Sequence, residues 1–462
     1  MSELGIYLHI PFCSRKCHYC DFNSGPLSQT ARGDYLEVLR QEIATSPWKG
    51  CKARTVFLGG GTPSELSIPE LGALVDALRQ TFHVKRHAEW SIECNPGTVS
   101  RPYFVALKQM GFNRISLGAQ TFHDHHLQSL GRIHNSAQTR EAYRELREAE
   151  CDNVNLDLIF GLPNQTLQEW ESDLSEALSL SPEHLSLYNL TIEAGTEFGN
   201  RHARGDLREI DEDLCADMYE RAMERTQAAG YDQYEISNYS RPGRQCAHNL
   251  IYWRKEPYLG FGVSAASFKD GVRWTNTGNL NEYARTASSG RVTRASEETL
   301  KDREALGEEI MLRLRTCEVP VADALEQGWG GAHNLEPLAL EHPAASWRWA
   351  LLVLARVAVG AERLLDAVQG VPVDVLRPQE IALCLAWVTE ADRRRAWRLG
   401  FVFHRQAKVD PVVGVSLKDM SREILLVKPL HYPEFVVGVR VVEPRGHRFI
   451  PPDTGRLGVG FG

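Results

Sequence analysis

The sequence predicts an α/β fold: a partial barrel of six βα units, followed by a smaller accessory region and a divergent C-terminal tail. Three observations predict it. Short β-rich runs alternate with helical patterns from residue 4 to about 230, the rhythm changes after about residue 235, and the composition shifts beyond Cys317. Regular βα alternation produces a parallel sheet with right-handed crossovers, and six units are too few for the closed eight-stranded form.

Six apolar, β-rich runs are the predicted strands. In chain order they are Ile6 to Ile10, Thr55 to Leu58, Trp90 to Glu93, Arg114 to Leu117, Val154 to Ile159 and His184 to Thr191. Between them apolar residues recur at helical spacing, as they do from Tyr35 to Ile43. Two helices are expected to begin at capping boxes, Ser67 to Glu70 and Thr166 to Glu169, where side chains satisfy free backbone N–H groups.

Three domains follow from these changes in pattern. We expect the core barrel at residues 1–235, the accessory region at 236–316 and the tail of unassigned fold at 317–462. The tail contains an apolar helix candidate, Trp347 to Val359, and an arginine-rich run, Arg393 to Arg398. Such a run fits either a contact with nucleic acid or a solvated helix face, and its charge pattern favours the solvated face.

Composition and charge narrow the class of protein. Sixty acidic and 52 basic side chains give a net charge of −8, which offers no general attraction to nucleic acid or anionic lipid. The longest apolar stretch, near Trp349 to Gly360, contains Arg356 and is shorter than the roughly 20 residues of a spanning helix. We therefore expect a cytoplasmic protein without a nucleic-acid partner or a transmembrane segment. Peripheral membrane contact and a homodimer stay open.

Three cysteines follow the first predicted strand at close spacing. Cys13, Cys17 and Cys20 lie within eight residues. Thiolates suit iron–sulfur clusters, and three on one loop can hold three irons of a [4Fe–4S] cube while the fourth iron stays open. A structural zinc site usually has a fourth Cys or His, and His9 and His18 keep that alternative open.

The spacing Cys-x3-Cys-x2-Cys, with an aromatic residue before the last Cys and a preceding His-Ile-Pro-Phe, resembles the radical S-adenosylmethionine (SAM) superfamily. The resemblance implies a [4Fe–4S] cluster whose open iron binds SAM, cleavage of SAM to a 5′-deoxyadenosyl radical and an electron donor, here unidentified. The cofactors of such proteins carry out the difficult chemistry, while the chain orients them.

Further polar and glycine residues follow the other predicted strands. Taken singly, the Gly59 to Gly61 run is typical of a tight turn and the polar residues of a surface, but they share one edge of the sheet. Resemblance to the coproporphyrinogen-dehydrogenase branch of the superfamily implies SAM contacts at Tyr7, Tyr19, Gly60, Gly61, Thr62, Glu93, Gln120, Arg132 and Asp157.

Two families of that branch compete. Oxygen-independent coproporphyrinogen III oxidases, which decarboxylate propionate side chains, have another Cys two places after the third, whereas this chain has Phe22 there. The HemW family of haem chaperones has Cys-Asp-Phe at this point and a His-Asn-x-x-Tyr-Trp motif. This sequence contains both, the second as His248, Asn249, Tyr252 and Trp253, and it resembles HemW proteins from residue 4 to about 316.

A neutral imidazole is a common protein ligand for haem iron. Resemblance to the HemW family therefore implies haem ligation at His248, although a lone His beside aromatic residues is also typical of packing. Cys246 is expected to be a buried thiol. We expect a haem chaperone that binds a [4Fe–4S] cluster, SAM and haem and passes haem to acceptor proteins. Porphyrinogen decarboxylation and a barrel that retains its cluster only for structure are the alternatives.

One further histidine cluster has the composition of a metal site. His123, His125 and His126 lie together, but the sequence shows no obvious remote ligand for them. We therefore interpret them as surface residues.

Overall fold

The computed structural model describes residues 3–287, 292–300, 305, 308, 312 and 315–317. The tail, for which the sequence predicts no particular fold, therefore lies outside the described residues from residue 318 on, and so do its apolar helix candidate and its arginine-rich run. The three predicted domain boundaries stay a prediction.

A parallel sheet of six strands forms the core, as the sequence predicts. In space the strands follow one another in chain order. They are β1 (Leu4–Ile10), β2 (Lys52–Gly60), β3 (His83–Cys94), β4 (Arg114–Gln120), β5 (Val154–Phe160) and β6 (His184–Asn189). Strand β1 is buried along nearly its whole length because both of its faces are covered, which explains its continuous apolar sequence. The last strand ends at Asn189 rather than at Thr191.

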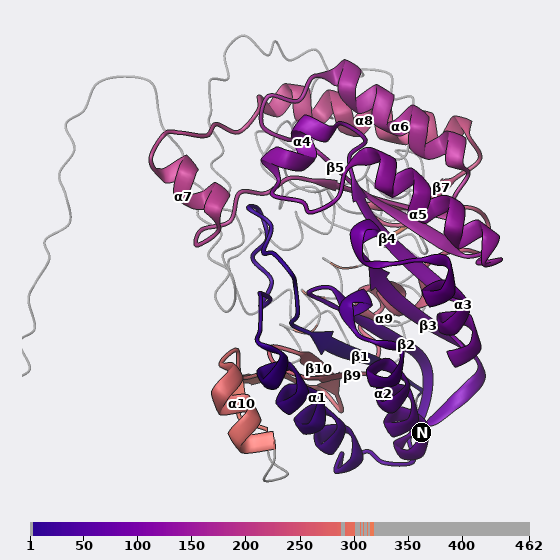
Figure 1. Ribbon diagram of the computed structural model, residues 1–462, viewed down its shortest axis with the longest axis vertical. Coiled ribbons are helices and arrows are strands. Elements are labelled where there is room, and N and C mark those ends of the chain that lie inside the picture. Colours follow the sequence, from indigo (N-terminus) through magenta and orange to yellow (C-terminus); the bar gives the residue numbers. More distant parts are fainter. Residues whose placement is uncertain are drawn as a thin grey trace, which may run out of the picture.

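Helices connect these strands, and most of them cover the outside of the curved sheet, as Figure 1 shows. The helices between the six strands are α1 (Gln29–Ala44), α2 (Ile68–Thr81), α3 (Arg101–Met110), α4 (Asp124–Ser129), α5 (Ser136–Glu148) and α6 (Leu167–Leu180). After β6 follow α7 (Glu197–Ala203), which projects on the open side in Figure 1, and α8 (Glu212–Ala228). Short 3-10 turns follow β2 and β3, at Pro63–Glu65 and Pro96–Thr98. Both predicted capping boxes, at Ser67 and Thr166, are present.

The sheet continues past both ends of the parallel core. Strand β9 (Tyr258–Phe261) pairs parallel to β1, and β10 (Ala266–Lys269), β11 (Val272–Asn276) and β12 (Arg294–Thr299) extend it as antiparallel neighbours. At the other edge, β8 (Asn238–Ser240) and β7 (Asp232–Gln233) follow β6. The twelve strands thus form one sheet.

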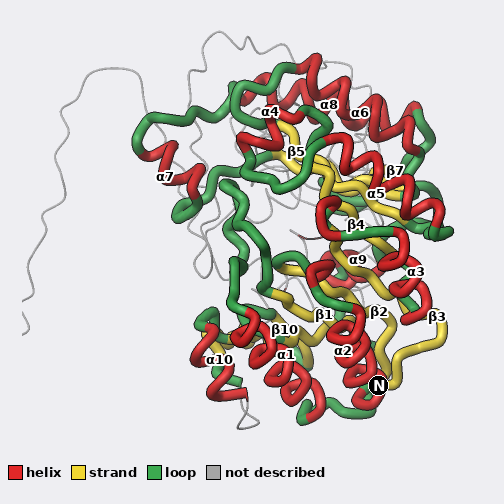
Figure 2. The backbone as a smooth tube through the Cα atoms, viewed as in Figure 1, coloured by secondary structure: helices red, strands yellow, loops and turns green. Residues whose placement is uncertain are grey.

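Two short helices belong to the chain that follows the core. Helix α9 (Ala247–Trp253) lies against β2, and α10 (Leu280–Ala287) lies beside α1. Figure 2 shows how loops gather on the open side of the curved sheet, opposite the outer helices. Within the described residues, every helix is too short or too polar to cross a bilayer.

Candidate functional site

A cavity of about 400 Å³ lies at the carboxyl ends of the parallel strands. Loops from five strands line it, which is the expected place for a site in a βα fold because these loops vary over a rigid base. The cavity collects all three predicted cluster cysteines and every predicted SAM contact except Tyr7. These residues are Cys13, Cys17, Cys20, Tyr19, Gly60, Gly61, Thr62, Glu93, Gln120, Arg132 and Asp157.

The cysteine loop is anchored by contacts with the chain just after it, with the loop that follows β2 and with Arg132. The amide of Cys13 donates to the carbonyl of Gly25 at 3.1 Å, and its sulfur lies 3.3 Å from the hydroxyl of Thr62. The guanidinium of Arg132 donates to the sulfur of Cys17 at 3.6 Å. Burial raises the pKa of the Cys13 thiol, although the hydroxyl of Thr62 acts in the opposite direction, and burial also raises the pKa of the Cys20 thiol. All three thiols are partly exposed.

The spacing of the sulfurs favours a cluster over zinc. The three cysteine sulfurs do not all lie within 4.8 Å of one another. In the described part of the chain, only His123, His125 and Glu169 bring three ligand atoms that close together. A [4Fe–4S] cube gives each thiolate its own iron and therefore accepts sulfurs that are spaced more widely than the ligands of one zinc ion. The imidazole of His9 bonds to Asn23 and Tyr7, so it is not a free fourth ligand.

The structure also explains why the run at the end of β2 consists of glycines. Gly60 has a φ of +110°, and a Cβ there would lie 2.5 Å from the ring of His9. A Cβ on Gly61 would lie 2.6 Å from the carbonyl oxygen of Phe12. The backbone of the run therefore lies against the cysteine loop so closely that only glycine fits. This contact brings the rim of the cavity next to the cluster cysteines.

Two partly buried carboxyl groups, Glu93 and Asp157, face the cavity from β3 and β5. Burial raises the pKa of Glu93 to about 8, and the charge of Asp157 adds to the effect. Burial also raises the pKa of Asp157, although Ser116 and Asn155 donate hydrogen bonds to it at 2.8 Å each. The amide of Gly60 donates to Glu93 at 3.1 Å. Such acceptors suit the hydroxyl and amino groups of a ligand.

Two arginines, Arg15 and Arg132, line the cavity, and Arg132 brings positive charge next to Cys17. Its Nη2 donates to Asn95 and to the carbonyl of Gly118 at 2.9 Å each. Its Nε is buried without a hydrogen-bond partner, and such an orphaned donor indicates a missing acceptor. Gln120 lies beside it at the end of β4 with a φ of +67°, a strained conformation for a non-glycine residue that is typical of functional sites. The polar groups present therefore fit an amino acid-like ligand such as SAM.

The structure adds lining residues that the sequence analysis did not single out. Asn95 follows β3 and accepts from both Arg132 and His134 at 2.9 Å each. Tyr188 and Asn189 end β6 and line the same cavity. The rule that sites gather at the carboxyl ends of strands could have found these three residues. Tyr7, in contrast, lies below the cavity, where it stacks on Phe57 and its hydroxyl contacts His9.

The predicted haem residue, His248, lies elsewhere. It is 1% exposed on α9, next to the amino-terminal half of β2. Its Nδ1 is 2.7 Å from the hydroxyl of Thr55 and its Nε2 is 2.8 Å from the hydroxyl of Tyr252. Its ring stacks on Phe57, and burial lowers its pKa to about 3. Both ring nitrogens are therefore engaged. Asn249, Tyr252 and Trp253, also on α9, are partly buried.

A second cavity, of about 610 Å³, borders α9. It lies some 16 Å from the first along β2, because Thr55 and Gly60 are five residues apart in an extended strand. Basic side chains predominate in its lining, which consists of Arg54, Thr55, Lys85, Arg86, His87, Glu89, Ala247, Leu250 and Arg254. Thr55 connects this second cavity with His248, because it lines the cavity and its hydroxyl contacts the imidazole.

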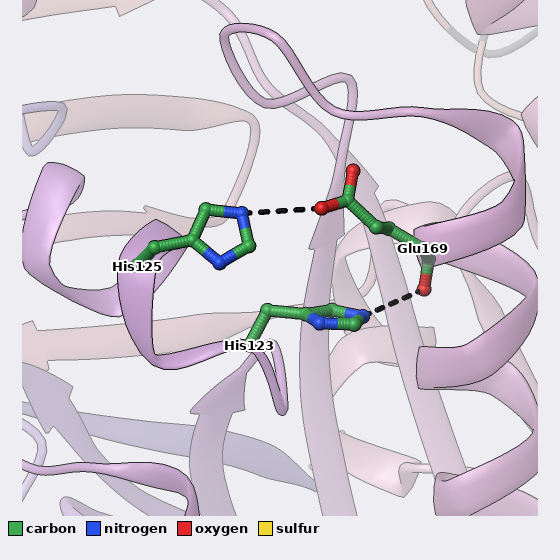
Figure 3. Close-up of side chains that lie close together, drawn as sticks. All are labelled: His123, His125 and Glu169. Atoms are coloured by element: carbon green, nitrogen blue, oxygen red, sulfur yellow. Dashed lines mark hydrogen bonds and ion pairs between the residues drawn. The ribbon is translucent and has the colours of Figure 1, made fainter.

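The interpretation of the histidine cluster as surface residues without a remote partner is wrong in two respects. His125 is 62% exposed, but His126 is only 3% exposed, because α4 packs its ring toward α6. A remote ligand also exists: Glu169 on α6 lies 3.1 Å from Nε2 of His125. Figure 3 shows His123 and His125 turned toward Glu169. The sequence could not show this because Glu169 is more than forty residues away.

Comparison with known proteins agrees with this geometry. Residues 7–177 match the radical SAM superfamily. The heme chaperone HemW of Lactococcus lactis is 38% identical over 309 residues, which cover 67% of this chain and 80% of that protein. The HemW of Escherichia coli is 42% identical over 285 residues, 60% of this chain and 74% of that protein.

A solved structure supports the fold. The coproporphyrinogen III oxidase of Escherichia coli, a radical SAM enzyme, superposes with a TM-score of 0.62 over 71% of this chain and 79% of its own. Its sequence identity is 24%, so this likeness shows the fold alone.

Proposed function

Because this chain belongs to the HemW family of heme chaperones within the radical SAM superfamily, we propose that it binds a [4Fe–4S] cluster, SAM and haem in the cytoplasm and passes haem to acceptor proteins. The observation that carries the proposal is the meeting of the three cysteines with a polar, partly buried cavity at one end of the barrel.

The residues of the first cavity divide into three roles in this proposal. Cys13, Cys17 and Cys20 hold the cluster. Arg132 and Gln120 hold the carboxylate end of SAM, supported by the unpartnered Nε of Arg132. Glu93 and Asp157 accept hydrogen bonds from its hydroxyl and amino groups. When bound, the cluster and SAM supply one-electron chemistry, and the chain orients them away from water.

Haem is proposed to bind at α9, on the side of the second cavity. The basic residues of that cavity suit the two propionates of haem, since cations pair with carboxylates. With both nitrogens of His248 hydrogen-bonded, ligation of iron requires α9 to move away from β2. A ligand that is exposed only when its helix moves fits a protein that must both hold haem and release it.

We expect His248→Ala to weaken haem binding at least about tenfold, because iron loses its axial ligand. The measurement is a titration of the full chain, with its cluster reconstituted under anaerobic conditions, followed by the Soret band. His184→Ala is the matched control, since His184 is also 1% exposed and contacts Asn155 and Tyr234 through its two nitrogens. Haem dimethyl ester, which lacks the propionate charges, should bind less tightly.

Equal haem affinity in the His248→Ala variant and the wild type would contradict the assignment of the ligand. Delivery is tested by mixing the haem-loaded chain with a haem-free b-type cytochrome and following the acceptor's spectrum. Conversion of coproporphyrinogen III at many turnovers per chain would instead favour porphyrinogen decarboxylation.

A further inference from the structure

Three histidines and a glutamate meet between α4 and α6, outside the cavity described above. Nε2 of His125 is 3.1 Å from Oε1 of Glu169, and Nε2 of His123 is 3.1 Å from the backbone carbonyl of Glu169. Ligand atoms of His123, His125 and Glu169 all lie within 4.8 Å of one another. Figure 3 shows the ring of His125 directed at the carboxylate of Glu169 and the ring of His123 directed at the backbone carbonyl of the same residue.

A second observation points to a ligand at the same place. His126 is 3% exposed, and its Nε2 lies 3.6 Å from Oε2 of Glu169. This nitrogen is buried and has no hydrogen-bond partner. A buried imidazole nitrogen whose nearest acceptor, Oε2 of Glu169, lies just beyond hydrogen-bond distance has lost the water that it would otherwise bond, and a metal ion would restore that interaction.

The surrounding structure holds the cluster in place. Oδ1 of Asp173, one helical turn after Glu169 on α6, accepts from the amide of Phe122 at 2.7 Å, and Oδ2 accepts from the hydroxyl of Thr121 at 2.7 Å. These bonds fix the chain directly before His123. Glu169 itself is fixed by the capping box with Thr166. The donors therefore lie on two anchored elements, which favours a defined site over a chance encounter of surface side chains.

We propose that His123, His125 and Glu169, with His126 beside them, form a binding site for a divalent transition metal ion of the zinc class. Two imidazoles and one carboxylate are a ligand set that zinc accepts. Magnesium and calcium prefer oxygen ligands, so two imidazole ligands disfavour their binding. The ligand atoms around one tetrahedral zinc ion lie about 3.3 Å from one another. The more widely spaced of the three side chains must therefore approach one another by roughly 1 Å to bind the ion. The ion joins α4 to α6 and so fastens the segment between Gln120 and Arg132.

The test is a calorimetric titration of zinc chloride into the full chain, after its cluster has been reconstituted without oxygen so that the cysteines are occupied. One zinc ion per chain is expected. Zinc K-edge absorption should show nitrogen or oxygen neighbours at about 2.0 to 2.1 Å, whereas a thiolate site would show sulfur at about 2.3 Å.

Two substitutions test the ligands. Glu169→Gln keeps the capping box, which accepts either residue, but removes the anionic ligand. His125→Ala removes a ring that is 62% exposed, although its other side packs on His126 with the ring centroids 4.1 Å apart. Each should lower zinc affinity at least about tenfold. Glu70→Gln is the matched control, because Glu70 has the same place in the capping box of α2, and its zinc affinity should equal that of the wild type.

A sulfur-only zinc environment, or an affinity that neither His125→Ala nor Glu169→Gln reduces, would overturn the proposal. Thermal unfolding without zinc shows that each variant is folded. The titration uses neither haem nor SAM, and iron content measured beforehand reports the cluster separately, so failure of zinc binding is distinguishable from failure of the proposed function.

Discussion

At the scale of single residues, the first cavity contains carboxyl groups that are shielded from water. Glu93 and Asp157 are both partly buried carboxyl groups, and burial raises the pKa of each. The sequence predicted both residues at one edge of the sheet and predicted that the glycine run lets the backbone approach a ligand, but not that it approaches the cysteine loop. Asn95 and the burial of His126 were not predicted, because a side chain's partners depend on residues remote in the sequence.

Glu93 should make stability depend on pH. Its pKa in the folded chain is about 8, above its ordinary value of 4.5, so the folded chain keeps a proton that the unfolded chain releases. The free energy of unfolding should therefore fall as the pH rises through this window and level off above it. Between pH 5.5 and 7.5 the loss due to this group is about 2 kcal/mol.

Urea unfolding of the cofactor-free chain at these two pH values measures this loss. Glu93→Gln cannot ionise, so its free energy of unfolding should fall by about 2 kcal/mol less over the same interval. An identical pH dependence in variant and wild type would show that Glu93 is already ionised at neutral pH.

At the scale of elements, α9 is held to the sheet by Glu89 of β3. The two oxygens of Glu89 accept from the backbone amides of His248 and Ala247 at 2.9 and 3.0 Å. The His-Asn-x-x-Tyr-Trp motif is recognisable in the sequence, but its hydrogen bonds to Glu89 are not, since β3 and α9 are far apart in the chain. If haem binds only when α9 moves, weakening the attachment should favour haem.

Glu89→Gln should therefore lower stability and raise haem affinity together. An amide offers one acceptor oxygen instead of two, which leaves a backbone amide unpaired at a cost of about 1 to 3 kcal/mol. Thermal unfolding and Soret titration measure the two effects. Asp211→Ala, which removes the N-cap of α8, is the control for stability loss alone. A parallel fall in haem affinity would mean that haem binds while α9 is seated.

At the scale of the whole molecule, one partly buried carboxyl group, that of Glu42, joins the core to the chain that follows it. Glu42 of α1 accepts from the amide of Gly262 at 2.8 Å, from Asn276 at 3.0 Å and from the hydroxyl of Tyr283 at 2.6 Å. Burial raises its pKa to about 7. Together with the pairing of β9 to β1, this contact makes residues 258–283 part of the structure that contains the barrel.

Glu42→Ala should destabilise the chain by at least about 3 kcal/mol, because it leaves three donors without an acceptor. It should also separate the unfolding of the two regions, so that tryptophan fluorescence and circular dichroism no longer report one transition. Glu37→Ala, on the exposed face of the same helix, should change stability by less than about 0.5 kcal/mol. Coincident transitions in the Glu42→Ala variant would contradict this coupling.

The sequence by itself determined the six βα units, their capping boxes and the edge of the sheet where cysteines, glycines and polar residues gather. These features depend on local periodicity and on neighbours within a few residues. Only the tertiary structure decided that His248 is buried with both nitrogens bonded, that Arg132 has an unpartnered nitrogen, and that Glu169 meets the histidines of α4. Each depends on how segments that are distant in the chain pack together, which no local pattern encodes.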